Sequence, residues 1–193
     1  MRAAFLAVLP ALAACGGFGH VNQGQVVAYQ AAEGLVTLIS DSNFRDPAHP
    51  RFDVLPPVAI RVPQDPREMG PEPAPGKLLL LDCAHRRAVI FDAGSQALRT
   101  VPCTLIAERT PVLSGDSRVL KATSAPLDRA TGAITVYSAR QRKLMVFSVP
   151  PEFRDLPPDS WRFGDEIRYY YKDPGRALRL MNVSKTDLSR AGN

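Results

Sequence analysis

The chain has 193 residues, 45% of them hydrophobic and 22% charged, which is enough for one medium or two small globular domains with a real core. Its 18 prolines, about twice the usual share, argue against long helices and favour loops and edge strands. The net charge of +5 favours anionic surfaces but falls short of the dense basic patch of a nucleic-acid binder, so we expect no nucleic-acid partner.

The N-terminus reads as a targeting signal. Arg2 is followed by an apolar run, Ala3–Leu12, that is too short to span a bilayer. The run ends in Leu12-Ala13-Ala14-Cys15, which resembles the lipobox of bacterial lipoproteins, where the cysteine accepts the lipid. The alternative is an ordinary secretory signal with a chance cysteine.

The lipobox resemblance implies that residues 1–14 are a signal peptide and that lipidated Cys15 holds the protein on a membrane. Two or three acyl chains give stable anchoring where one would be marginal. Gly16, in place of an aspartate, favours the outer membrane, with the protein facing the periplasm. Residues 15–23 are then expected to be a short tether between the lipid and the fold.

Two segments read as β-hairpins. Residues 24–40 (GQVVAYQAAEGLVTLIS) and 132–148 (GAITVYSARQRKLMVFS) align without a gap at an offset of 108, with four identities that include Tyr29 and Tyr137. Three short motifs, Phe-Arg-Asp, Ile-Arg and Asp-Pro, follow both hairpins in the same order. This pattern predicts an internal duplication, although two generic hairpins can also look alike because strand composition is narrow.

The duplication divides the mature chain into three parts: a first β-unit at residues 24–82 with a Pro-rich insertion at 67–75, a connecting β-hairpin segment at 83–131, and a second β-unit at 132–193. In the connecting segment we expect strands at Ala88–Phe91 and Leu98–Ile106, a turn at residues 114–117 and a short strand at Val119–Thr123. About ten short strands in all predict an all-β fold, with two related small OB-like or SH3-like barrels or sandwich units.

The cysteines left after lipidation are Cys83 and Cys103, an even pair in an oxidising compartment. They are predicted to form a disulfide, with two buried thiols as the alternative. Cys83 and His85 lie on one face if their strand continues, so they could act as nucleophile and base or as half a metal site. No further cysteines or histidines cluster with them in the sequence, and we expect neither catalysis, metal nor cofactor there.

The most suggestive surface mixes aromatic and basic side chains near the C-terminus. Such mixtures bind saccharides, anionic polymers or a partner's edge, although aromatics are also ordinary strand residues. The candidate binding residues are Trp161, Arg168, Tyr169, Tyr171 and Arg176.

The segment Phe163–Lys185, with its Phe-Gly-Asp-Glu-Ile-Arg start, together with the lipobox, resembles small envelope lipoproteins of unassigned function from sulfate-reducing and related bacteria. That resemblance implies no activity and no catalytic residue. We therefore expect a lipid-anchored envelope protein with a non-catalytic binding or structural role, its partner an envelope protein or an anionic envelope polymer. The alternative is an envelope enzyme, or an accessory to one, that uses the neighbourhood of Cys83 and His85.

Overall fold

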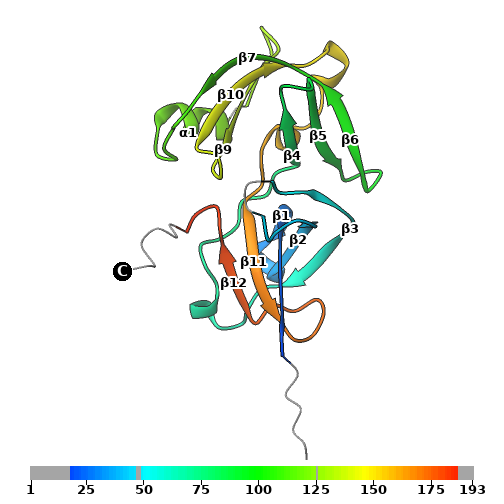
Figure 1. Ribbon diagram of the computed structural model, residues 1–193, viewed down its shortest axis with the longest axis vertical. Helices are drawn as coiled ribbons and strands as arrows, with labels where there is room; N and C mark the ends of the chain where they lie inside the picture. The colour runs from blue at the N-terminus through cyan, green and yellow to red at the C-terminus, as the bar shows by residue number, and fades with distance from the viewer. Residues whose placement is uncertain (1–17, 47–48, 125, 187–193) are drawn as a thin grey trace, which may run out of the picture.

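The computed structural model describes residues 18–46, 49–124 and 126–186, and most of its regular structure is antiparallel β-sheet (Figure 1). The strands assort into two lobes, which we call the terminal lobe (residues 18–76 and 162–186) and the central lobe (residues 77–161). The prediction of an all-β fold is confirmed. Cys15 and the predicted signal peptide lie outside the described residues.

The terminal lobe is one five-stranded sheet in the order β12-β11-β1-β2-β3. Its strands are β1 (His20–Gln30), β2 (Leu35–Asp41), β3 (Phe52–Arg61), β11 (Glu166–Tyr171) and β12 (Arg179–Asn182), with short 3₁₀ turns η1 (Ala31–Glu33) and η2 (Pro66–Glu68). The sheet curls so far that Arg61 forms two backbone hydrogen bonds of 2.9 Å, with Gly175 and Ala177. None of the described sheets is closed by a full strand pairing, so of the two predicted alternatives, barrel or sandwich, the sandwich fits.

The central lobe holds two sheets in the orders β4-β5-β6 and β7-β10-β9-β8. Its elements are β4 (Leu78–Asp82), β5 (Arg87–Asp92), β6 (Ala97–Pro102), β7 (Thr104–Arg109), α1 (Ser117–Ser124), β8 (Leu127–Asp128), β9 (Ala133–Ser138), β10 (Lys143–Ser148), η3 (Pro151–Phe153) and η4 (Pro158–Trp161). Buried Cys103 is the single residue between β6 and β7, so one nearly continuous stretch of chain passes from the first sheet into the second.

The central lobe contains a repeat at an offset of 46 residues, which we call the first copy (residues 81–104) and the second copy (residues 127–150). Every strand pair of the β5–β6 hairpin recurs in β9–β10: Ala88 faces Val101 in the first copy, and Ile134 faces Phe147 in the second. The preceding strands keep the same register, since Asp82 faces Arg87 and Asp128 faces Ala133. The two copies are therefore built on one backbone plan.

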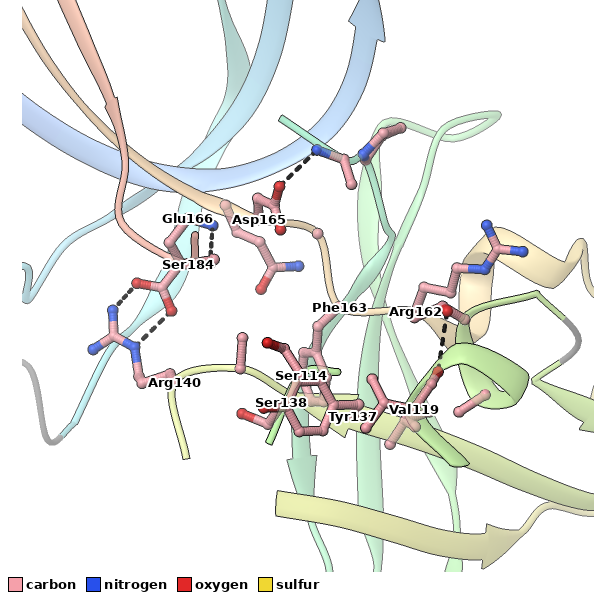
Figure 2. A pocket seen from close by; sticks show the side chains of 18 of the residues that line it. Ser114, Val119, Tyr137, Ser138, Arg140, Arg162, Phe163, Asp165, Glu166 and Ser184 are labelled. Carbon is pink, nitrogen blue, oxygen red and sulfur yellow. Dashed lines mark hydrogen bonds and ion pairs between the residues drawn. The ribbon is translucent and has the colours of Figure 1, made fainter. Parts of the chain in front are cut away.

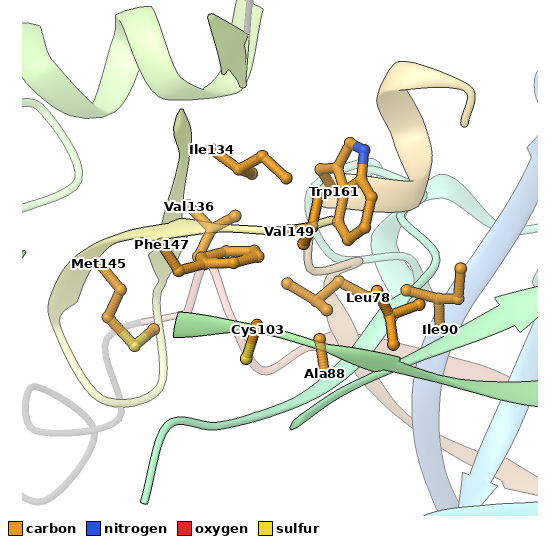
Figure 3. Packing of buried hydrophobic residues seen from close by; sticks show 11 residues of the cluster. Leu78, Ala88, Ile90, Cys103, Ile134, Val136, Met145, Phe147, Val149 and Trp161 are labelled. Carbon is orange, nitrogen blue, oxygen red and sulfur yellow. The ribbon is translucent and has the colours of Figure 1, made fainter. Parts of the chain in front are cut away.

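Equivalent residues of the two copies also share one core. The buried pairs at the 46-residue offset are Ala88/Ile134, Ile90/Val136, Val101/Phe147 and Cys103/Val149. Figure 3 shows side chains of both copies, among them Ala88, Cys103 and Phe147, gathered with Trp161 in this core. The ring of Phe147 meets Trp161 edge-on at 6.1 Å, a favourable geometry for two aromatic rings.

The strand pairing does not follow the predicted duplication at an offset of 108. Both segments are hairpins, but β1–β2 belongs to the terminal sheet and β9–β10 to a central sheet. β3 pairs with β2, whereas its supposed counterpart β11 pairs with β1 and β12 rather than with β10. The described part of the predicted second unit, residues 132–186, is thus split between the lobes. Residues 20–23, expected in the tether, are part of β1.

The segment Val119–Thr123 is helical, which corrects the predicted short strand. The Asp116 side chain accepts a hydrogen bond from the backbone N–H of Arg118, and this satisfies one of the free donors at the start of α1. Val119 and Ala122, three residues apart, then fall on one helix face and are buried. A half-buried strand would instead bury every second residue, and residues 119–123 do not.

The chain crosses between the lobes twice, at residues 76–78 and 161–164, and the two crossings bond to each other. Leu78 donates its backbone N–H to the carbonyl oxygen of Arg162 at 2.9 Å. At the second crossing a Cβ on Gly164 would overlap the carbonyl oxygen of Val26, so only glycine fits without a backbone shift. These contacts fix how the lobes meet.

Candidate functional site

A cleft of about 440 Å³ opens between the two lobes. This volume lies in the usual range of small-molecule sites, about 300–1,000 Å³. One wall is α1 and the β9–β10 turn of the central lobe, and the other is the second crossing and the start of β11 (Figure 2). The cleft is therefore built by segments that are far apart in sequence.

The floor of the cleft is apolar. The side chains of Val136 and Trp161 line it from the central core and Phe163 from the crossing, and Leu79 lines it from a small cluster that joins the two lobes. Helix α1 adds the apolar lining residues Val119, Leu120 and Ala122. Leu120 is 61% exposed, so an apolar edge continues from the floor to the rim. A ligand in the cleft would bury most of its contact surface against hydrocarbon.

The polar end of the cleft is an ion pair between the lobes. Arg140, in the β9–β10 turn, donates through Nε to Glu166 Oε1 at 2.6 Å and also pairs with Oε2. Gln23 donates to Glu166 Oε2 at 3.2 Å and accepts from Arg168 at 3.0 Å. Burial lowers the pKa of the Arg140 guanidinium, which shows that the charge is withdrawn from water and depends on its partners.

Two further ion pairs flank the cleft. Asp165 accepts hydrogen bonds from the backbone of Ala74 at 2.8 Å and from Asn182 at 2.9 Å, and it pairs with Lys185 at 3.0 Å. Asp159 pairs with Lys77 at 2.8 Å at the first crossing. The charged lining residues are three cations and three carboxylates, namely Arg140, Arg162, Lys185, Asp159, Asp165 and Glu166. The lining as a whole is therefore formally neutral.

Two uncharged polar side chains of the lining form hydrogen bonds within the protein. Tyr137 donates its phenol hydrogen to the carbonyl oxygen of Val112 at 3.0 Å, and burial raises its pKa. Gln25 donates to the carbonyl oxygen of Leu78 at 2.7 Å and so ties β1 to the first crossing. The hydroxyls of Ser114 and Ser138 also line the cleft and can offer a ligand hydrogen bonds.

A second cavity, of about 350 Å³, lies on another side of the junction between β3 and the β4–β5–β6 sheet. Phe52 and Leu79 line both cavities. These two side chains thus stand between the cavities.

The predicted disulfide is absent: Cys83 and Cys103 are both free thiols. Burial raises the pKa of Cys103 to about 11, with the neighbouring Cys83 the next cause, and burial also raises the pKa of Cys83. Cys83 and His85 lie in the β4–β5 turn, but Nδ1 of His85 bonds to Asp82 at 2.8 Å. The turn therefore holds the imidazole on a carboxylate, and the pKa of the Cys83 thiol lies above its usual value.

The predicted aromatic and basic binding surface does not form one surface. Trp161 is wholly buried in the central core and Tyr169 is buried in the terminal core, against which Tyr171 packs. Arg168 and Arg176 are exposed and bond to Gln23 and Gln64. The aromatic residues of this stretch serve packing because alternate residues of β11 point into the curled sheet.

The sequence reasoning did not identify Arg140 and Glu166 as partners. Arg140 is one of several charged residues in a hairpin turn, and Glu166 lies within the C-terminal segment singled out by resemblance. Nothing in either local pattern indicates a pair 26 residues apart in sequence that joins two lobes. In the described part of the chain no three His, Cys, Asp or Glu side chains are placed to hold a metal ion, and no helix there could cross a membrane.

A family model described as a domain of unknown function (DUF4881) matches residues 17–191, and the chain belongs to that family. The match spans every described residue, so both lobes and the cleft fall within it. No curated protein and no solved structure matches the chain.

Proposed function

We propose that this protein is a lipid-anchored envelope protein whose two lobes bind a small, mainly apolar and uncharged molecule in the cleft between them. The cleft supports the proposal because its floor is apolar and the positive and negative charges of its lining are equal in number. A strongly anionic ligand would have to compete with Glu166 for Arg140 and with Asp165 for Lys185. A neutral ligand with one hydrogen-bonding group can use the ion pairs without breaking them.

The envelope location rests on the lipobox-like Leu12-Ala13-Ala14-Cys15 and is part of the same proposal. We place the protein on the periplasmic side of the outer membrane. The measurement is the mass of the N-terminal peptide from envelope-extracted protein, which is expected to carry acyl chains on Cys15. A Cys15→Ala variant is expected to keep the signal peptide and to lose the acyl mass, and an unmodified Cys15 in the wild type would contradict the location.

The binding experiment uses the offset-46 repeat as its control. Ala139 lines the cleft, whereas its equivalent in the first copy, Ala93, is exposed in the same kind of turn outside the cleft. We expect Nile red, a neutral apolar dye, to bind residues 18–193 saturably, since every described strand lies within them. Ala139→Trp should weaken that binding at least tenfold and Ala93→Trp should leave it unchanged. Equal dye affinity in both variants would remove the cleft as the site.

The observed thiols speak against the enzyme alternative. A nucleophilic cysteine needs a lowered pKa, but burial, followed by Glu108 and Asp82, raises the pKa of Cys83. We expect iodoacetamide to alkylate Cys83 more slowly than free glutathione at pH 7.5. Alkylation faster than glutathione would favour an enzyme at this turn over a binding protein.

A further inference from the structure

One end of the terminal lobe exposes apolar side chains, and it is the end away from the central lobe (Figure 1). The start of β1 and the end of β11 lie side by side there, with Val21 opposite Tyr170. Leu178, in the loop before β12, donates its backbone N–H to the carbonyl oxygen of Tyr170 at 2.8 Å. Phe18, Val21 and Leu178 are 98%, 49% and 41% exposed.

The backbone of this end is packed and cannot withdraw its apolar side chains easily. The ring of Tyr170 lies where a Cβ of Gly19 would sit, so the chain just after Phe18 is pressed against β11. His20 pairs with Tyr171 in the sheet, and their rings lie 5.4 Å apart. Phe18 therefore leaves the fold from a fixed point beside Tyr170.

Basic side chains lie beside the apolar patch. Lys172 and Arg176 are exposed in the loop that follows β11. Arg176 bonds to the neutral side chain of Gln64, so this bond does not neutralise its charge. Asp173 is the one acidic residue between Lys172 and Arg176. Aromatic residues at the headgroup level with nearby cations are the usual composition of a protein surface that lies on a bilayer.

The covalent chain limits how far this end can lie from the lipid. Phe18 is three residues after Cys15, and a fully extended chain spans at most about 3.6 Å per residue, or roughly 11 Å in total. With acyl chains of Cys15 in the bilayer, Phe18 must lie within the headgroup region or just outside it. The rest of the patch, packed on Tyr170, lies beside it.

We propose that the patch of Phe18, Val21, Tyr170 and Leu178, with Lys172 and Arg176 beside it, rests on the bilayer that holds the protein's own acyl chains. This inference rests on the proposed lipidation of Cys15. It gives the molecule a fixed orientation, with the terminal lobe on the membrane and the central lobe above it. The cleft then lies on the aqueous side, and its ligand enters from water rather than from the lipid.

The test places tryptophan in the lipidated full-length protein and reconstitutes it in vesicles with bromine-labelled acyl chains. Bromine quenches indole fluorescence only at short range. Leu178→Trp and Val21→Trp report on the patch, and Leu113→Trp is the matched control because Leu113 is 68% exposed in the central lobe. Trp161, which is wholly buried in the central lobe, sets a common background.

We expect at least threefold greater quenching for Leu178→Trp and Val21→Trp than for Leu113→Trp. If the protein floats with the vesicles and all three variants are quenched alike, lipidation stands and the proposed surface is wrong. If the lipid-bearing fraction does not float at all, the anchoring proposal fails, and the surface proposal fails with it.

A second arm tests the charges. Lys172→Glu with Arg176→Glu is expected to reduce the quenching of Leu178→Trp at least twofold in vesicles that contain phosphatidylglycerol, and to have a smaller effect in pure phosphatidylcholine. Equal quenching in the two lipids, with and without the charge reversal, would exclude the electrostatic part of the contact.

Discussion

The two copies in the central lobe share a backbone plan but not a surface. Strand register and turn length correspond residue by residue at the 46-residue offset, and four equivalent pairs are buried in one core. The β5–β6 turn of the first copy points to solvent with Ala93 and Gly94, whereas the β9–β10 turn of the second copy faces the terminal lobe with Ala139 and Arg140. The comparison shows that the core is built from the register and buried residues that the copies share. The cleft depends on the turn residues in which they differ.

The largest expected effect concerns the position where the copies differ most in chemistry, Arg140 against Gly94. Arg140→Ala leaves Glu166, which is buried, without its cation, and we expect a loss of about 3 kcal/mol in the free energy of unfolding. Gly94→Arg adds the same side chain to the exposed turn and should change stability by less than about 0.5 kcal/mol. Urea unfolding at pH 7 measures both.

The double variant Arg140→Met with Glu166→Leu separates burial of a lone charge from loss of packing. Replacing both members of a buried ion pair by apolar groups is often close to neutral. We therefore expect it to recover most of the stability lost in Arg140→Ala. A double variant as unstable as Arg140→Ala would mean that the pair positions the lobes by more than charge compensation.

The next effect concerns the turn before each hairpin, where both copies use a left-handed residue. Gly132 has φ +70° and its equivalent Arg86 has φ +53°. A residue with a side chain pays about 1–2 kcal/mol for this conformation. Gly132→Ala is therefore expected to lose about 1–2 kcal/mol, because its Cβ would also crowd Arg154. Arg86→Gly should be neutral or gain up to about 1 kcal/mol, and a loss there would contradict the equivalence.

Much of the fold could be predicted from the sequence, but the choice of repeat could not. The offset of 108 shows four identities in 17 residues, and the offset of 46 shows five in 24, so identity alone does not separate them. The five identical pairs are Leu81/Leu127, Asp82/Asp128, Ala84/Ala130, Ala93/Ala139 and Leu98/Leu144. Any two hairpins share alternating apolar residues and turn residues. Only strand register, a three-dimensional property, shows which pair has the same neighbours.

The cleft could not be predicted for a related reason. Arg140 meets Glu166 because the chain leaves the terminal lobe near residue 77 and returns near residue 162, and no local pattern marks these two crossings as neighbours. Trp161 and Tyr169 were expected at a surface because aromatic and basic residues alternate there. Instead the core of the central lobe buries Trp161, and the curled terminal sheet buries Tyr169.

A smaller effect is expected where the copies differ only in shape. Cys103 and its equivalent Val149 are both buried in the same core, and each is only 3% exposed. Cys103→Val gives the first copy the residue that the second copy has at this position. Such volume-conserving changes usually lower the free energy of unfolding by less than about 1.5 kcal/mol. Urea unfolding of this variant should lie within that limit of the wild type. A larger loss would show that Cys103 has a partner that Val149 lacks.

The smallest expected effect is on stability at low pH, and it concerns Asp82 and Asp128, the equivalent aspartates near the start of the two copies. Backbone hydrogen bonding to His85 first, and then the side chains of His85 and Arg87, lower the pKa of Asp82. Thr131 and the backbone of Ala130 lower the pKa of Asp128. A carboxylate whose folded pKa lies below its unfolded value, about 3.9, adds stability above that pH and loses it as the pH falls through the folded value.

Each Asp→Asn variant should therefore show a flatter fall in the free energy of unfolding between about pH 4 and pH 2 than the wild type does. Salt should distinguish the copies, because Asp82 lies 2.8 Å from Nδ1 of His85 and 3.2 Å from the Arg87 guanidinium, whereas the hydrogen bonds of Asp128 are to backbone N–H groups and Thr131. Raising the ionic strength should shrink the Asp82→Asn difference and leave the Asp128→Asn difference nearly unchanged. An equal salt response would mean that the turn backbone, which the copies share, sets both carboxylates and that the charges of His85 and Arg87 contribute nothing.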